Sequence, residues 1–503
     1  MKRIFLSLFA LGSTTAIAQR PNIVLFLVDD MGWQDCSVPF HSDTTMWNRI
    51  YETPNMERLC SMGMKFTHAY AAPVSSPSRI SLITGVNATR HHVTNWTLQK
   101  DISTDMNNDK LAFEPWNVNG FTPEQGIDGA YYGTSFVQLL RDNGYLTLFV
   151  GKAHFGALST PAENPLNIGF EYNIAGHAAG GPASYLSETH YGESNKLFAV
   201  PGLESYYDSD TFLTEALSLE ALKLLEIADK DSRPFFLYMS HYAVHAPFDM
   251  DKRYYDKYIA KGLEDVEARY AALIEGMDKS LGDLLDYLET KGKLDNTIIM
   301  FMSDNGGYSV GVRHNTYGGI GKSYPLRGGK GSLYEGGVRE PMIVYAPGLT
   351  TPGAINNSPI MIEDFYPTIL ELAGIRGAET IQDLDSRSFV KALRGYNINS
   401  KRYLYWHYPN HWGERYGDCG APGSAIISGD MKYIHFYENG DSELYDLKAD
   451  IGECNNLIGK SRKYDRKAKK LAKKLSAKLR QEQSSMPLYK DTMKRVNYPD
   501  QSF

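Results

Sequence analysis

Ser75 stands at a position where a hydroxyl group could take part in a reaction. Pro77 and Arg79 follow it, at the start of the apolar run 80–83. Proline has a fixed φ that suits the first turn of a helix, and it lacks the N–H that such a turn leaves unpaired. We therefore expect Ser75 just ahead of a helix N-terminus, where the N–H groups favour a developing anion. Arg79, one turn further on, can bring its guanidinium to the same place, although a merely capped helix would show the same local pattern.

Other polar residues follow apolar runs that are typical of strands buried on both faces. Open α/β sheets bind ligands outside the carboxyl ends of their strands, so side chains that follow several strands should converge in one site. Taken singly, each polar residue could equally be a solvated turn or a surface group. The runs and the residues after them are 22–28 with Asp29 and Asp30, 146–150 with Lys152 and His154, 234–239 with His245, and 297–302 with Asp304 and Asn305.

The chain resembles the sulfatase family from about Pro21 to its end. Residues 75–79 are similar to the family pattern of Cys or Ser, any residue, Pro, Ser or Ala, an optional residue and Arg, and 80–85 resemble the helix that follows it. The resemblance implies an α/β fold of the alkaline-phosphatase type, with a large, mixed, mostly parallel sheet between layers of helices. It also implies a sulfuric ester hydrolase.

The resemblance further implies that Ser75 is oxidised after translation to Cα-formylglycine, by a maturase that accepts serine. In the hydrated form, one oxygen would attack sulfur, and deprotonation of the other would expel sulfate. Such covalent catalysis divides one difficult step into two easier ones.

Ten residues match functional positions of the family. Four oxygen donors match its calcium ligands, and a set without His or Cys suits Ca²⁺ or Mg²⁺ better than Zn²⁺. Three cations match the groups that hold the sulfate, where fixed positive charge lowers the barrier. Two histidines match those that take the diol proton and protonate the leaving alcohol, respectively. The matches are Ser75 as nucleophile; Asp29, Asp30, Asp304 and Asn305 as ligands; Arg79, Lys152 and Lys330 as cations; His154 and His245 as proton carriers.

Length and composition bound the class of protein. A chain of 503 residues with 42% hydrophobic content can bury a large core, and its net charge of −7 argues against a nucleic-acid-binding surface. Residues 1–18 have a basic start, an apolar run at 4–11 and small residues before Gln19, which is typical of a secretory signal cleaved after Ala18. The apolar run is too short to span a bilayer. We therefore predict an exported protein, periplasmic or secreted, with no membrane partner.

Residues 19–394 are predicted to form the catalytic domain and residues 395–503 a smaller C-terminal α+β subdomain. Short strand-like pieces at 402–407, 424–427, 432–436 and 443–446 indicate an antiparallel sheet. A basic helix at 460–481 has one apolar stripe and otherwise a solvated face. The four cysteines (Cys36, Cys60, Cys419 and Cys454) have no metal-type spacing, and we expect free or buried thiols.

The substrate is predicted mainly from overall likeness to exported bacterial glycan sulfatases. That likeness implies a carbohydrate sulfate ester, on a mucin O-glycan or a glycosaminoglycan, with galactose or N-acetylgalactosamine sulfate as the expected unit. Three polar-aromatic stretches, 91–96, 176–181 and 406–412, could line a sugar pocket or be structural. The predicted sugar contacts are Asn95, Trp96, His177, His407 and His411.

Two alternatives remain open from the sequence. A phosphatase or phosphodiesterase of the same superfamily would use an unmodified serine and two zinc ions, but Asn305 after Asp304 and Arg79 after Pro77 argue against it. A catalytically silent glycan-binding protein would result if Ser75 were never oxidised.

Overall fold

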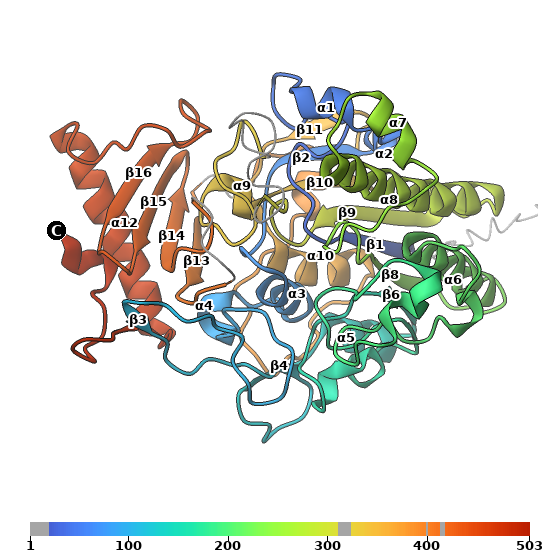
Figure 1. Ribbon diagram of the computed structural model, residues 1–503, viewed down its shortest axis with the longest axis horizontal. Coiled ribbons are helices and arrows are strands. Elements are labelled where there is room, and N and C mark those ends of the chain that lie inside the picture. The colour runs from blue at the N-terminus through green and yellow to red at the C-terminus, as the bar shows by residue number, and fades with distance from the viewer. Residues whose placement is uncertain (1–19, 310–322, 399–400, 413–417) are drawn as a thin grey trace, which may run out of the picture.

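A large mixed sheet forms the centre of the molecule (Figure 1). The computed structural model describes residues 20–309, 323–398, 401–412 and 418–503. Within these residues the sheet has nine strands in the order β11-β2-β10-β9-β1-β8-β6-β7, with β12 paired to β2. Strand β10 is antiparallel to both of its neighbours, and the other pairings are parallel. The strands are β1 (Asn22–Val28), β2 (Met64–Tyr70), β6 (Leu146–Gly151), β7 (Tyr172–Ile174), β8 (Phe235–Ser240), β9 (Thr297–Ser303), β10 (Arg339–Tyr345), β11 (Ala354–Asn356) and β12 (Ile360–Met361).

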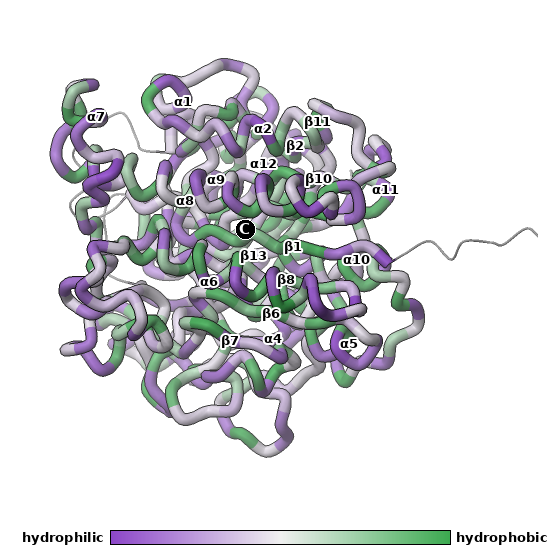
Figure 2. Tube along the Cα trace, turned by 90° about the vertical axis from the view of Figure 1, so that its right-hand side faces the viewer, coloured by the Kyte–Doolittle hydropathy of each residue, from purple (hydrophilic) through white to green (hydrophobic). Residues whose placement is uncertain are grey.

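Both faces of this sheet are covered by helices, and its central strands β1, β6, β8 and β9 are buried at every position. In β1, Val24 and Phe26 pack into one core, whereas Ile23 and Leu25 pack into the other. The strands β1, β8 and β6 accordingly appear as green tubes inside the molecule in Figure 2. The first core includes α2 (Pro54–Met62), α6 (Leu213–Ala228) and α8 (Asp265–Thr290), and the second includes α3 (Ser75–Thr84), α5 (Phe136–Asp142) and α10 (Phe365–Leu372). The predicted α/β fold is confirmed.

A smaller antiparallel sheet follows in the sequence and lies beside the main one (Figure 1). One face packs Leu404 and Trp406 against Tyr70 and Val74, next to Ser75, and the other face is covered by α12. The predicted antiparallel sheet and basic helix are confirmed, while a domain boundary at residue 395 stays a prediction. The elements are β13 (Tyr403–Tyr408), β14 (Gly423–Ser428), β15 (Met431–Phe436), β16 (Ser442–Asp446) and α12 (Arg462–Gln481).

Short elements complete the described chain. They are α1 (Met46–Ile50), α4 (Ala88–His91), α7 (Tyr255–Ala260), α9 (Glu335–Val338), α11 (Val390–Leu393), β3 (Leu111–Ala112), β4 (Gly120–Thr122), β5 (Ala130–Tyr132) and β17 (Leu488–Tyr489). All four cysteines are free thiols, as expected.

The search for membrane-spanning segments covers the described residues, and none of their helices has the length and apolar character to cross a bilayer. The predicted signal peptide lies outside those residues.

Candidate active site

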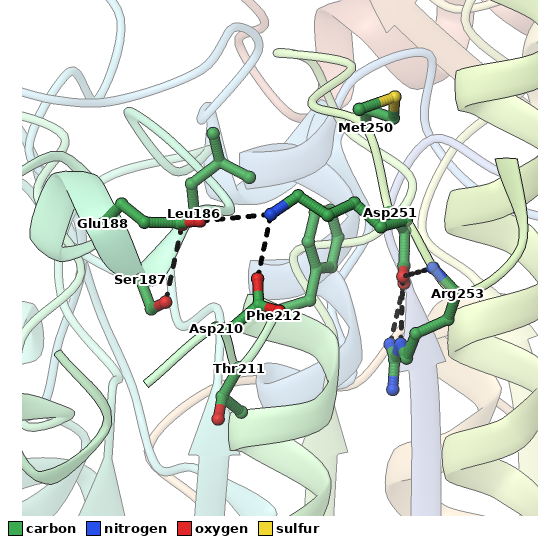
Figure 3. Close-up of a pocket in the computed structure, with 10 residues that line it drawn as sticks. Leu186, Ser187, Glu188, Asp210, Thr211, Phe212, Met250, Asp251 and Arg253 are labelled. Atoms are coloured by element: carbon green, nitrogen blue, oxygen red, sulfur yellow. Dashed lines mark hydrogen bonds and ion pairs between the residues drawn. The ribbon is translucent and has the colours of Figure 1, made fainter. Parts of the chain in front are cut away.

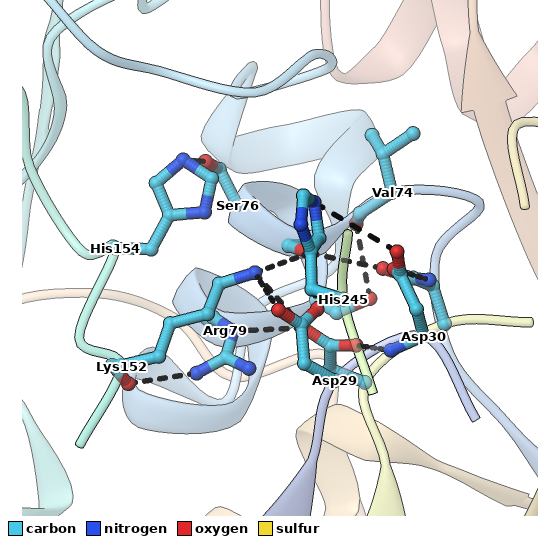
Figure 4. Close-up of polar contacts among 12 residues, drawn as sticks. Asp29, Asp30, Val74, Ser76, Arg79, Lys152, His154 and His245 are labelled. Carbon is cyan, nitrogen blue, oxygen red and sulfur yellow. Dashed lines mark hydrogen bonds and ion pairs between the residues drawn. The ribbon is translucent and has the colours of Figure 1, made fainter. Parts of the chain in front are cut away.

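The polar residues that follow separate strands meet at one edge of the main sheet. Asp29 and Asp30 follow β1, Lys152 follows β6, and Asp304 follows β9. Because β2 runs parallel to these strands, its carboxyl end delivers Ser75 to the same edge. Figure 4 shows the resulting cluster in front of the first turn of α3.

Ser75 lies at the centre of this cluster. Its Oγ is 3.0 Å from Asn305 Oδ1 and 3.2 Å from Asp29 Oδ1, and it accepts a hydrogen bond of 2.9 Å from Lys152 Nζ. The helix α3 begins at Ser75 itself and not one residue later, so the side chain belongs to the first helical turn. A group on this side chain therefore has a buried amine, a carboxylate and an amide within reach.

Three buried carboxylates lie beneath Ser75. One oxygen each from Asp29, Asp30 and Asp304 falls within 4.8 Å of the others. Each carboxylate has a buried cation as partner: Lys152 Nζ lies 2.7 Å from Asp29 Oδ2, Lys330 Nζ 2.8 Å from Asp30 Oδ2, and Arg79 Nε 2.8 Å from Asp304 Oδ2. Isolated buried charges would be strongly destabilising, so this alternation is required for the cluster to fold.

The balance of charge differs among the members of the cluster. Burial would raise the pKa of Asp30, but the charges of Lys330 and Lys152 hold it below its usual range. Burial raises the pKa of Asp29 despite the opposing charge of Lys152. Burial likewise lowers the pKa of Lys152 to about 8, against the opposing charge of Asp29. A further cation next to Asp29 would favour the ionised form of this carboxylate, because a nearby positive charge opposes the effect of burial.

His154 is buried beside Ser76, the residue after Ser75. Its Nε2 lies 2.8 Å from the backbone oxygen of Thr97 and 2.9 Å from Ser76 Oγ. Because a carbonyl oxygen only accepts, Nε2 carries the proton, and Ser76 can accept from it too. Burial, followed by the charge of Lys152, lowers the pKa of His154, so this ring is neutral.

His245 lies between His154 and Asp30 in the view of Figure 4. Its Nδ1 donates to the backbone oxygen of Ala246 at 2.6 Å, which leaves Nε2 directed at the site, 3.8 Å from Asp30 Oδ2. Burial and then the charge of Lys330 lower the pKa of His245 to about 3. The ring is therefore neutral until an added negative charge opposes these effects.

Two glycines allow the histidines to take these positions. A Cβ on Gly180 would lie 2.4 Å from Cε1 of His154, and one on Gly181 would lie 2.6 Å from Nδ1 of His245. Both distances are shorter than real Cβ contacts. The pair Gly180-Gly181 therefore forms a surface against which both rings pack. In the sequence, this surface is indicated by the two consecutive glycines in the stretch 176–181.

A cavity of about 250 Å³ opens above Ser75 and contains both histidines and Lys330. Its wall is aromatic, and of the predicted sugar contacts Trp96 lies in it. Sequence reasoning missed the other aromatic members, although Trp412 belongs to a stretch that it singled out. The lining side chains of this kind are Trp96, Phe198, Tyr308 and Trp412.

Four of the predicted sugar contacts are not among the described residues that line the cavity. The ring of His407 is bonded to Ser424 Oγ and to the backbone oxygen of Ser485. His411 contacts the backbone oxygen of Asn107, and Asn95 donates to Asp105 Oδ1. His177 contributes its backbone oxygen, which accepts from the N–H of His154. The four residues therefore contact the loops around the cavity in this structure, and their role in sugar binding stays a prediction.

A second, smaller pocket lies between the segments 186–188, 210–212 and 250–253 (Figure 3). Its volume is about 50 Å³, and Leu186 and Phe212 are among the residues that line it. Lys252 pairs with Asp210 at 2.9 Å and Arg253 with Asp251 at 2.7 Å. Lys252 also lies 3.4 Å from Glu188, so both cations of this pocket are already paired with carboxylates.

The fold and the strand-end site together define a hydrolase of the alkaline-phosphatase-like α/β class. A family model described as Sulfatase matches residues 21–375, and one described as N-sulphoglucosamine sulphohydrolase, C-terminal, matches residues 329–484. The first match covers more than half of the chain. The chain therefore belongs to the sulfatase family, and it is a sulfuric ester hydrolase.

Known proteins agree with this assignment. A sulfatase of Formosa agariphila is 29% identical over 96% of this chain and 92% of its own length. The N-acetylgalactosamine-6-sulfatase of Mus musculus is 30% identical over 75% of this chain and 67% of its own length. The crystal structure of Ps i-CgsB in complex with k-i-k-neocarrahexaose is 26% identical, with a TM-score of 0.71 over 92% of this chain and 93% of that one.

Proposed function

We propose that this sulfatase hydrolyses a sulfate ester on a carbohydrate, with galactose or N-acetylgalactosamine sulfate as the substrate unit. The observation that carries the proposal is the position of Ser75 on the floor of an aromatic-walled cavity, in contact with Lys152 and Asn305. Relatives named as N-acetylgalactosamine-6-sulfatases support the choice of sugar. A screen of defined sulfated saccharides tests it, and cleavage confined to non-sugar sulfates would refute the carbohydrate assignment.

The nucleophile at position 75 is proposed to be formylglycine, made by a maturase that accepts serine. Hydrated formylglycine supplies two hydroxyl groups on one carbon, so the sulfate bond formed there can be broken without attack by an outside water. The surroundings fit such a group, because Lys152, Asn305 and Asp29 lie within hydrogen-bond distance of the Ser75 side chain. The further proposal of export predicts a mature N-terminus at Gln19.

The four predicted ligands fit a single Ca²⁺ or Mg²⁺ ion. Asp29, Asp30 and Asp304 present oxygens to a common point, and the amide oxygen of Asn305 is turned towards Ser75 in the same cluster. All donors are hard oxygens, which these ions prefer. When bound, the ion would supply positive charge next to the nucleophile.

Metal analysis should find one calcium or magnesium ion per chain. Chelation should lower both activity and the melting temperature, since an ion at 100 times its Kd stabilises a protein by about 2.7 kcal/mol. Readdition of Ca²⁺ or Mg²⁺ should restore both. In Asp304→Asn, the chelator should shift the melting temperature much less than in the native protein. Two zinc ions per chain would contradict the assignment.

The cations of the cluster are proposed to hold the sulfate group. Lys330 and Lys152 reach the floor of the cavity, where negative charge builds up on the sulfate oxygens during transfer. A bound sulfate ester also brings negative charge close to His245. That charge opposes the effect by which Lys330 lowers the pKa of His245, so the ring gains a proton more easily in the complex.

The aromatic wall is proposed to pack against the sugar. Trp412 lies over Lys330, with Nζ 5.2 Å from the ring centroid, so a sugar attached to the bound sulfate would meet this ring. Replacing Trp412 by alanine should raise KM about tenfold, which corresponds to an aromatic packing term of ~1.4 kcal/mol. Trp412→Phe should retain most of the affinity. An unchanged KM for the alanine variant would show that the sugar does not use this wall.

A further inference from the structure

The loop that carries Lys330 is held by the C-terminal sheet as well as by the catalytic domain. The N–H of Lys330 donates to the backbone oxygen of Gly307, and the N–H of Gly331 to that of Pro73, both in the catalytic domain. The oxygen of Gly331, however, accepts a 2.8 Å hydrogen bond from the N–H of Gly420, which belongs to the chain leading into β14. The backbone next to Lys330 is therefore fixed from two sides.

The loop ends at Glu335, the first residue of α9, in a buried network of charges. Glu335 Oε1 lies 2.8 Å from Nζ of Lys432, which is on β15 of the C-terminal sheet. Glu335 Oε2 accepts from the hydroxyl of Tyr70 at 3.1 Å and lies 3.3 Å from Nη1 of Arg339. Tyr70 ends the strand that leads to Ser75. One carboxylate thus joins the nucleophile's strand, the Lys330 loop and the C-terminal sheet.

Lys432 is the cation that the C-terminal sheet contributes to this network, and it bridges two carboxylates. Its Nζ also lies 3.0 Å from Glu453 Oε1, and Glu453 Oε2 accepts from the N–H of Glu335 at 2.6 Å. Lys432, Glu335 and Glu453 are each fully buried. Without Lys432, Glu335 would keep its ion pair with Arg339, but Glu453 would lose its ion pair beside it, so one of the two buried carboxylates would be forced to move or to take up a proton.

The other end of the loop is held in the same manner. Arg327 forms a bidentate ion pair with Asp418: Nε donates to Oδ2 at 2.7 Å and Nη2 to Oδ1 at 2.8 Å. Its Nη1 also donates to the backbone oxygen of Glu453 and to the hydroxyl of Tyr445. The segment from Arg327 to Glu335 is therefore fixed at both ends by side chains of the C-terminal part of the chain.

We propose that the C-terminal subdomain contributes to catalysis by holding Lys330 in place, with Lys432 and Asp418 as positioning residues. Neither touches the cavity; both act by fixing the ends of the loop that presents Lys330. The inference rests on the proposed role of Lys330 in holding the sulfate. A small shift of that amine matters, because a displacement of about 1 Å at a reacting centre can cost on the order of 10²-fold in rate.

Lys432→Met keeps the length of the side chain and removes its charge. We expect kcat/KM for a sulfated substrate to fall about 10- to 100-fold, and the inhibition constant of inorganic sulfate to rise. Lys432→Arg should recover part of the loss. Lys448→Met, at an exposed position after β16, is the matched control and should be unchanged. All rates are to be measured on protein shown by its near-ultraviolet circular dichroism to be folded.

A double-mutant cycle with Lys330→Ala separates positioning from a general loss of structure. If Lys432 acts through Lys330, the double variant should be about as active as Lys330→Ala alone. Losses that multiply, or a Lys432→Met variant with native activity, would overturn the proposal. If Lys432→Met does not fold, Asp418→Asn, at a partly exposed pair, replaces it in the same cycle with the same two outcomes. Native activity of Lys330→Ala would instead refute the proposed role of Lys330, and the inference with it.

Discussion

Replacing Ser75 by alanine should lower kcat on the order of 10⁶-fold, as loss of a nucleophile does in other hydrolases. Nothing else among the described residues is placed to take over, because the hydroxyl neighbours of the site have other contacts. Ser76 Oγ is bonded to His154 and to the N–H of Thr97. Steady-state turnover of a sulfated saccharide by the folded variant measures the effect.

Ser78 provides the control for this experiment. It lies on the same helix and its Oγ accepts from the N–H of Ala72, so Ser78→Ala changes a hydroxyl next to the site without removing the nucleophile. We expect its activity to stay within about tenfold of the native value and its stability to fall by ~1 kcal/mol. The peptide that contains Ser75 should also be lighter by two hydrogens in active protein. Full activity with an unshifted peptide mass would contradict the formylglycine proposal.

The convergence of the site could be predicted because it depends on local patterns. Each apolar run is buried on both faces, which defines a strand, and Asp29, Lys152 and Asp304 directly follow such runs. The edge at which Asp29, Lys152 and Asp304 meet then follows from the parallel arrangement of the strands. The start of α3 was misplaced by one residue, because Pro77 is tolerated anywhere in the first turn.

The cavity wall could not be predicted in the same way, because loops supply it. His407 and Trp412 are close in the sequence, yet His407 is on β13 and bonds to Ser485, while Trp412 lies beyond the strand and covers Lys330. Polar and aromatic content alone does not distinguish these two orientations. The ion pair between Lys432 and Glu335 joins residues 97 positions apart, and no local sequence pattern predicts a buried ion pair over such a distance.

Loss of His245 should affect substrates according to their leaving groups. Its Nε2 faces the cavity beside Asp30, and Nδ1 is occupied by the backbone of Ala246, so Nε2 is the atom that can protonate a departing alcohol. The alkoxide of a sugar is a poor leaving group and needs that proton, whereas an activated phenolate leaves without it. Removal of a general acid typically costs about 10²–10⁴-fold. We therefore expect His245→Ala to lose this factor on a sugar sulfate and much less on an activated aryl sulfate.

His154→Ala is the comparison variant, because its loss of activity should be the same on the sugar sulfate and on the aryl sulfate. His154 contacts Ser76 and the backbone of Thr97, next to Ser75. Its proposed role is to take the diol proton when sulfate is expelled, a step common to both substrates, so its effect should not depend on the leaving group. Its loss should lower turnover of the sugar sulfate and the aryl sulfate by similar factors. The ratio of the two rates, measured for each variant, separates proton donation from simple damage to the site. Equal losses on the two substrates for His245→Ala would show that His245 binds or supports the substrate and does not donate the proton.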